Sequence, residues 1–209
     1  IAGTWRSWRP TSIYSKREPR VSVVYICSDD RRAGKTALAL ALGLRLARAG
    51  LAVGYWKPVR SAGVQDDDAG FARQVLRLAE DVAVLAPVTL PATTGEVASR
   101  AASEDVPRRL RRQLRDSFAG VVQGKDVLLV EGGEDLATGA AQGLGPGDVL
   151  ELMAAKAGAA PAVKALYLAR YRGGDLAERI ITAQRALGSA FAGTLINGVP
   201  AAHDWFVAE

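Results

Sequence analysis

The sequence has very few of the residues that build disulfides and soft-metal sites: one cysteine, one histidine and one methionine in 209 residues. Cys27 alone cannot form an intramolecular disulfide, so nothing in the chain requires an oxidising compartment. The single histidine, His203, excludes a histidine-based metal cluster and argues against a Ser-His-Asp triad. No apolar run approaches the ~20 residues that span a bilayer, and the N-terminus lacks the apolar segment of a secretory signal. We therefore expect a cytoplasmic protein without a membrane partner.

The positive charge of the chain, a formal +5 at pH 7, is concentrated at one end. Residues 1–20 contain five basic residues and one acidic residue, so they carry +4 and the remainder is close to neutral. Trp5, Trp8 and Tyr14 lie among these basic residues, as in segments that bind single-stranded nucleic acid or an anionic surface. A flexible extension explains the same composition without a ligand. We interpret residues 1–20 as a basic flexible N-terminal extension. Because the first residue is Ile1, we expect the sequence not to be an intact translation product.

From residue 21 onward, strand-like segments alternate with helix-like segments. Short β-branched and aromatic runs predict strands at 21–26, 51–56, 126–130, 162–169 and 192–196. Composition and spacing predict helices at 36–49, 69–78, 105–122, 148–157 and 175–187. The 36–49 helix is apolar nearly all round and is expected to be largely buried, whereas 60–65 and 83–95 are expected to be irregular. The alternation predicts a single α/β domain over residues 21–209 with a doubly wound, mostly parallel sheet.

A phosphate-binding loop is predicted where the first strand meets the first helix, at Gly34-Lys35-Thr36. Backbone N–H groups at a helix start bind anions, and the helix dipole favours negative charge there. In such a loop Lys35 reaches the β- and γ-phosphates, and the Thr36 hydroxyl ligates Mg²⁺. Asp29 stands where the full pattern has glycine, and residues 31–32 are arginines where it has small side chains. The order of strand, turn and helix nevertheless predicts a P-loop of the NTPase type.

Three further positions lie at the carboxyl ends of predicted strands, where open α/β sheets bind their ligands. Lys57 follows the second strand, Glu131 follows the third and Asn197 follows the fifth. A carboxylate in the position of Glu131, beside a phosphate loop, is expected to help bind Mg²⁺. Aspartates at 66–68 begin the next helix, where N-capping alone explains one of the three. Arginines at helical spacing in 105–122 predict a solvated basic face, with a docking surface as the alternative.

Four short motifs in this order resemble the dethiobiotin synthetase-like branch of P-loop proteins. They are Gly34-Lys35-Thr36, Lys57-Pro58-Val59, Val130-Glu131-Gly132-Gly133 and Ile196-Asn197-Gly198-Val199-Pro200. The resemblance covers about residues 21–200 and is nearest to the version found as the N-terminal domain of some phosphotransacetylases. Cobyrinic acid a,c-diamide synthases are more distant. Relatives in this branch continue with another strand and helix beyond Pro200, so we expect the domain to be truncated at its C-terminus.

The resemblance implies a role for each residue of the predicted site. The nucleotide would be held by Ala33, Gly34, Lys35, Thr36 and Asn197, and Mg²⁺ by Thr36, Asp68 and Glu131. Lys35 and Lys57 would be the catalytic residues, because their charge stabilises the charge that develops during attack on the γ-phosphate. Ser61 would contact a substrate. Asn197 would read the edge of a purine, with adenine expected, so the implied cofactors are ATP and Mg²⁺.

Departures from the family pattern favour nucleotide binding over dethiobiotin synthesis. Ser28 and Arg32 stand where dethiobiotin synthetases have glycine, and residues 86–100 contain no counterpart of their substrate-binding segment. Residues 167–174 look more like the phosphotransacetylase-associated version. We interpret the chain as a Mg-ATP-binding sensor or regulator, or a weak ATPase, with an acyl-phosphate-metabolising domain as its partner. An ATP-dependent ligase stays open, as does a homodimer. A nucleic-acid-binding module acting through residues 1–20 is the third alternative, and the near-neutral remainder of the chain argues against it.

Overall fold

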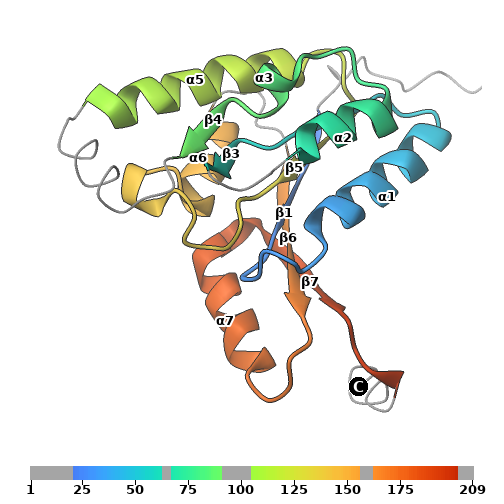
Figure 1. Cartoon of the computed structure of the whole chain (residues 1–209), viewed down its shortest axis with the longest axis vertical. Helices are drawn as coiled ribbons and strands as arrows, with labels where there is room; N and C mark the ends of the chain where they lie inside the picture. Colours follow the sequence, from blue (N-terminus) through green and yellow to red (C-terminus); the bar gives the residue numbers. More distant parts are fainter. Residues whose placement is uncertain (1–20, 63–66, 91–104, 156–161, 202–209) are drawn as a thin grey trace, which may run out of the picture.

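Figure 1 shows the protein as a computed structural model. The structure describes residues 21–62, 67–90, 105–155 and 162–201. The predicted basic extension, residues 1–20, lies outside the described residues, and so does His203.

A five-stranded parallel sheet forms the centre of the domain. Its strands are β1 (Ser22–Cys27), β2 (Val53–Trp56), β5 (Val127–Glu131), β6 (Ala162–Arg170) and β7 (Phe191–Asn197). The order across the sheet is β2-β5-β1-β6-β7, and every neighbouring pair is parallel. β2 and β5 are buried along nearly all of their length, which explains why their sequences are continuous apolar runs. The predicted fold class and the five predicted strands are thus confirmed.

Helices cover both faces of the sheet, with α1 and α2 on one side and α6 and α7 on the other (Figure 1). The α-helices are α1 (Lys35–Arg48), α2 (Asp68–Leu76), α3 (Val82–Leu85), α5 (Asp105–Val121), α6 (Pro146–Ala155) and α7 (Leu176–Leu187). Two 3₁₀ turns are η1 (Ala140–Gln142) and η2 (Gly188–Ala190). α5 packs on β2, where the rings of Phe118 and Trp56 have centroids 5.3 Å apart. Because helices cover each face of the sheet, a ligand site on this sheet is expected at the ends of the strands.

The first helix, α1, is less buried than its sequence predicts. Of its 14 residues, Lys35, Ala39, Leu40 and Gly43 are buried. The packing on that side is close, since a Cβ on Gly43 would lie 2.8 Å from Leu76 Cδ2. The expectation of a largely buried helix is wrong because α1 lies against one face of the sheet and its other side faces solvent. Many of its outward apolar residues are alanines, which favour the helix and expose little apolar area.

A second, two-stranded sheet stands beside the central one. β3 (Val59–Ser61) pairs in parallel with β4 (Val88–Leu90), and the short helix α3 precedes β4. Residues 60–61 and 83–90 are therefore more regular than expected, while 63–66 and 91–104 lie outside the described residues. Strands of three residues are too short for an alternating pattern to stand out from the sequence. This small sheet follows directly from β2 and supplies one wall of the candidate site.

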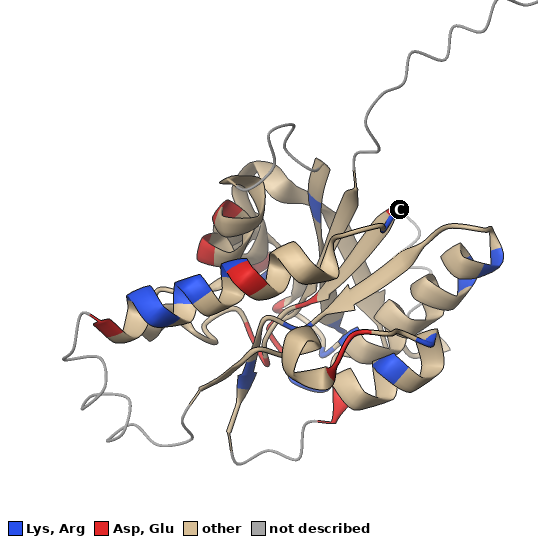
Figure 2. Ribbon diagram, turned by 90° about the horizontal axis from the view of Figure 1, so that it is seen from above, with Lys and Arg blue, Asp and Glu red and all other residues tan. Residues whose placement is uncertain are grey.

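The long helix α5 presents its arginines to solvent, and Figure 2 shows them as blue segments along its ribbon. Its buried side consists of Leu114, Phe118 and Val121. Arg111 also links α5 to the start of α6, because its Nη2 lies 3.0 Å from Asp148 Oδ1. The arginines of α5 therefore form an exposed basic face, as the sequence predicts.

Candidate nucleotide-binding site

The candidate site lies where β1, β2 and β5 end, next to the N-terminus of α1. Gly34 occupies the N-cap position of α1 with a φ of 102°, a left-handed conformation that residues with a Cβ rarely adopt. A Cβ there would also lie 3.1 Å from Asn197 Nδ2. Backbone conformation and the approach of the end of β7 therefore both require glycine at this position.

Lys35, the first residue of α1, turns back across the loop and is 5% exposed. Its Nζ donates to Ser28 Oγ (2.7 Å), to the carbonyl oxygen of Asp30 (3.2 Å) and to that of Glu134 (3.0 Å). A lysine ammonium has three donors, so these three acceptors satisfy it. The Ser28 hydroxyl in turn donates to the carbonyl oxygen of Asp30 at 2.6 Å. A phosphate at this lysine would replace at least one of the three acceptors.

Glu131, at the end of β5, is the centre of a buried polar cluster and is 1% exposed. The Thr36 hydroxyl donates to its Oε1 at 2.9 Å, and the Tyr55 hydroxyl donates to its Oε2 at 2.9 Å. Lys57 Nζ lies 3.4 Å from Oε1 and also forms an ion pair with Asp68. The cluster joins the first turn of α1, the ends of β2 and β5, and the first residue of α2.

Burial acts against the charged forms of the two innermost groups. It raises the pKa of Glu131, while the charge of Lys57 and the hydrogen bonds from Thr36 and Tyr55 act in the opposite direction. Burial likewise lowers the pKa of Lys35, and the charge of Glu131 opposes that shift. The cluster therefore keeps opposite charges together where water stabilises them poorly.

The oxygen atoms of this cluster fit a magnesium ion that is held jointly with a nucleotide. Among the described residues, no group of three or more His, Cys, Asp or Glu side chains is placed to hold a metal ion. A hydroxyl and a carboxylate do meet at Thr36 and Glu131, and Asp68 lies on the other side of Lys57. Mg²⁺ typically takes one or two carboxylates and completes its shell with phosphate oxygens and water. The donor set suits that arrangement.

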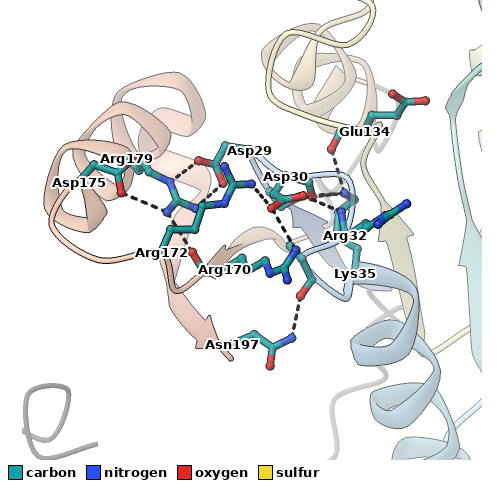
Figure 3. Close-up of polar contacts among 12 residues, drawn as sticks. Asp29, Asp30, Arg32, Lys35, Glu134, Arg170, Arg172, Asp175, Arg179 and Asn197 are labelled. Carbon is teal, nitrogen blue, oxygen red and sulfur yellow. Dashed lines mark hydrogen bonds and ion pairs between the residues drawn. The ribbon is translucent and has the colours of Figure 1, made fainter. Parts of the chain in front are cut away.

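The two aspartates of the loop, Asp29 and Asp30, face arginines from the end of β6 to the first turns of α7, as Figure 3 shows. Arg179 binds the Asp29 carboxylate through two nitrogens, with Nη2 2.9 Å from Oδ1. Arg172 forms an ion pair with Asp30, and Arg170 Nη1 lies 4.0 Å from the same carboxylate oxygen. These contacts fix the loop to residues about 140 to 150 positions later in the chain.

The arginines keep both loop carboxylates ionised. Burial by itself raises the pKa of Asp29, but the net shift is downward, and the hydrogen bonds of Arg179 are the largest lowering cause. The pKa of Asp30 is lowered chiefly by its hydrogen bond from Arg172. The negative charges of Asp29 and Asp30 are thereby neutralised by arginines from outside the loop.

A cavity of about 210 Å³ opens beside the loop. Its walls come from the loop and the start of α1, from the ends of β2 and β5, and from β3 and α2. The lining residues are Arg31, Arg32, Lys35, Thr36, Lys57, Val59, Arg60, Asp68, Glu131, Gly133 and Glu134. Five of the predicted site residues, Lys35, Thr36, Lys57, Asp68 and Glu131, thus come together around one space.

The remaining predicted site residues lie elsewhere. Ser61 ends β3 and is not part of the lining of this cavity, although its neighbour Arg60 is. Ala33 is fully buried within the loop, and its carbonyl oxygen accepts a hydrogen bond from Asn197 Nδ2 at 2.8 Å. Asn197 therefore contacts the loop directly through its side-chain amide nitrogen.

Sequence reasoning missed several residues that shape the site. Ser28 and Glu134 bind Lys35, and Tyr55 binds Glu131. The loop is bound by three arginines, namely Arg170 at the end of β6, Arg172 after it and Arg179 in α7. Ser28 drew attention as a departure from glycine, and residues 167–174 as a segment typical of one branch. Neither feature predicts which residues pair with each other, because the partners are far apart in the sequence.

A parallel α/β sheet with a lysine and a hydroxyl at the helix start after β1 defines the class of P-loop NTPases, which are nucleotide-binding proteins. Within that class, the sequence profile of the AAA domain family matches residues 22–157, and the chain belongs to this family.

Solved structures with the same fold include the signal recognition particle receptor FtsY from Elizabethkingia anophelis in complex with GDP. The two chains are 14% identical with a TM-score of 0.54, and the alignment covers 93% of this chain and 52% of FtsY. The chain therefore spans about half the length of that receptor. The kinase domain of the Escherichia coli tyrosine kinase ETK is 15% identical, with a TM-score of 0.46 and coverage of 89% and 71%. Within the part of the chain that the structure describes, no helix combines the length and apolar character needed to cross a membrane.

Proposed function

We propose that this P-loop protein binds ATP with Mg²⁺ and belongs to the dethiobiotin synthetase-like branch, near the phosphotransacetylase N-terminal domain. The observation that carries the proposal is the convergence of five predicted residues on one cavity. They are Lys35, Thr36, Lys57, Asp68 and Glu131. Lys35 and the N-terminus of α1 would hold the phosphates, and Thr36 with Glu131 would hold the metal, whose charge would offset that of the phosphates.

The position of Lys57 fits two functions of the bound nucleotide, that of a sensor and that of a ligase substrate. Its ammonium lies between Asp68 and Glu131, the two carboxylates proposed for the metal. In a sensor, this lysine reports metal binding by exchanging its carboxylate partners. In an ATP-dependent ligase, it stabilises the negative charge that develops on the phosphoryl group. We favour a sensor or weak ATPase that regulates an acyl-phosphate-metabolising partner, because Ser61 does not line the cavity and the ligase substrate segment is unrecognised.

The metal role of Thr36 is tested with Thr36→Val, which removes the hydroxyl at nearly constant shape. The ATP affinity measured by calorimetry is expected to fall at least fivefold in Mg²⁺ and to change less than twofold in EDTA. Thr182→Val is the matched control, since that hydroxyl bonds within α7 to the Glu178 carbonyl oxygen. Equal losses with and without Mg²⁺ would contradict the assignment of a metal ligand.

A turnover assay separates the sensor from the ligase. With 7,8-diaminononanoate, bicarbonate and Mg-ATP, the purified protein is expected to form no dethiobiotin at a useful rate. Any slow ATP hydrolysis should fall in Lys57→Ala and in Glu131→Gln. Robust dethiobiotin formation that is lost in Lys57→Ala would make the ligase the correct reading.

A further inference from the structure

More positive than negative side chains line the cavity beside the loop, and the excess lies outside its buried end. At that end, Lys35 and Lys57 are matched by the carboxylates of Asp68 and Glu131. These four groups serve the proposed phosphate and metal sites. The remaining charged groups form what we call the rim of the cavity, which consists of Arg31, Arg32, Arg60 and Glu134.

Three arginines and one glutamate are the other charged residues that line the cavity. Arg31 and Arg32 belong to the loop after β1, Arg60 to β3, and Glu134 to the segment after β5. Arg31 and Arg32 are exposed, and no carboxylate of the described residues forms an ion pair with either guanidinium group. The rim therefore carries an excess of positive charge.

The loop aspartates do not neutralise this rim, although they directly precede its arginines. Asp29 is bound by Arg179 of α7, and Asp30 by Arg172, which follows β6. Asp30 Oδ1 accepts the backbone N–H of Arg32 at 2.8 Å, and the ion pairs of Asp30 with described residues are made with Arg170 and Arg172. Figure 3 shows the Arg32 side chain directed away from Asp30.

Arg60 is oriented by its neighbours in the small sheet. Its Nε donates to Thr89 Oγ1 on β4 at 2.8 Å, across the residue pair Arg60–Thr89 of the parallel β3–β4 ladder. The hydrogen bond fixes the plane of the guanidinium group at the wall of the cavity. A planar guanidinium group binds carboxylate or phosphate oxygens in pairs, which a lysine cannot do.

We propose that Arg31, Arg32 and Arg60 form a second anion subsite, which binds a carboxylate or phosphate group of a small molecule next to the nucleotide phosphates. The inference rests on the proposed nucleotide site. Arg32 replaces a glycine of the resembled enzymes, so the subsite is a property of this chain rather than of that branch. The ligand is a small anion bound beside the nucleotide, because the phosphates are expected at Lys35 and the start of α1, and the metal at Thr36 and Glu131.

The test uses the whole protein saturated with Mg²⁺ and a non-hydrolysable ATP analogue. Succinate and inorganic phosphate are titrated separately, and binding is followed by calorimetry and by amide NMR shifts. The wild type is expected to bind at least one of the two probes. Arg60→Gln and Arg32→Gln should weaken that binding at least fivefold, and Arg60→Lys should fall between. Arg45→Gln, an exposed arginine of α1, is the control and should bind as the wild type.

Nucleotide affinity, measured first, separates this inference from the proposed function. Arg60→Gln is expected to bind the analogue within twofold of the wild type. Succinate and phosphate that both fail to bind the wild type would overturn the subsite, as would Arg60→Gln binding them unchanged. A loss of nucleotide affinity as large as the loss for the probe would assign the arginines to the nucleotide instead. If the wild type bound no nucleotide, the proposed function would fail, and the same titrations without nucleotide would still test the subsite.

Discussion

Replacing Arg179 with methionine is expected to destabilise the fold by about 2 kcal/mol. That figure lies between the ~0–1 kcal/mol of an exposed ion pair and the ~3–5 kcal/mol of breaking a buried one. The side chains of Arg179 and Asp29 are 12% and 25% exposed, so the pair is largely withdrawn from water. Arg179 also donates to the carbonyl oxygen of Arg170 at 2.9 Å, a contact that methionine cannot make.

The destabilisation should depend on pH through Asp29. The folded-state pKa of this carboxyl is lowered, so its pairing stabilises the fold above the ordinary aspartate pKa of about 3.9. The stabilisation is lost as the pH falls through the lowered pKa. The difference between wild type and Arg179→Met is therefore largest at neutral pH and shrinks in acid.

Urea denaturation at a series of pH values measures this difference. Arg185→Met is the matched control, because Arg185 is an exposed arginine of the same helix. It should change the free energy of unfolding by less than about 0.5 kcal/mol. The reasoning is refuted if Arg179→Met costs no more than the control, or if its cost is the same at pH 7 and in acid.

Three other substitutions or truncations give simpler outcomes. Asn197→Ala removes the donor to the Ala33 carbonyl oxygen. It should weaken ATP binding modestly and reduce discrimination against CTP in competition assays. Equal affinity of the wild type for ATP and CTP would contradict this role. Deleting residues 1–20 should leave the melting temperature and ATP affinity nearly unchanged, and a large drop in either would show that the segment packs on the domain. Gly54→Ala should lower the free energy of unfolding by about 1–3 kcal/mol. The added Cβ would lie 2.9 Å from Leu128 Cδ1 and 3.3 Å from the Val121 carbonyl oxygen. A neutral result in denaturation would show that α5 and β2 separate easily.

The parts of the fold that the sequence predicts well depend on local patterns. The apolar runs of β1 and β5 and the glycine before Lys35 are each visible within a few residues. Glu131 is predictable because it ends an apolar run in a parallel sheet, where strand ends meet at one edge. Local patterning also places α5, whose charged and apolar residues alternate at helical spacing.

The parts that escape prediction depend on contacts between distant residues. The pairing of Asp29 with Arg179 joins positions 150 residues apart, and the Tyr55–Glu131 hydrogen bond joins positions 76 apart. The sequence overpredicts the burial of α1, because an apolar composition does not say how many sides of a helix are covered. β3 is missed because three residues beside Pro58 are too few to show a period.

Calorimetric titration of Mg-ATP into the wild type and Lys35→Ala tests the central claim most directly. Lys35 is placed at the loop with three hydrogen bonds that phosphate oxygens can replace. The account predicts that the wild type binds Mg-ATP and that Lys35→Ala binds it at least tenfold more weakly, about 1.4 kcal/mol. Lys164→Ala, an exposed lysine of β6, should bind as the wild type does. Equal affinity of Lys35→Ala and wild type for Mg-ATP would contradict the assignment of this loop as the nucleotide site.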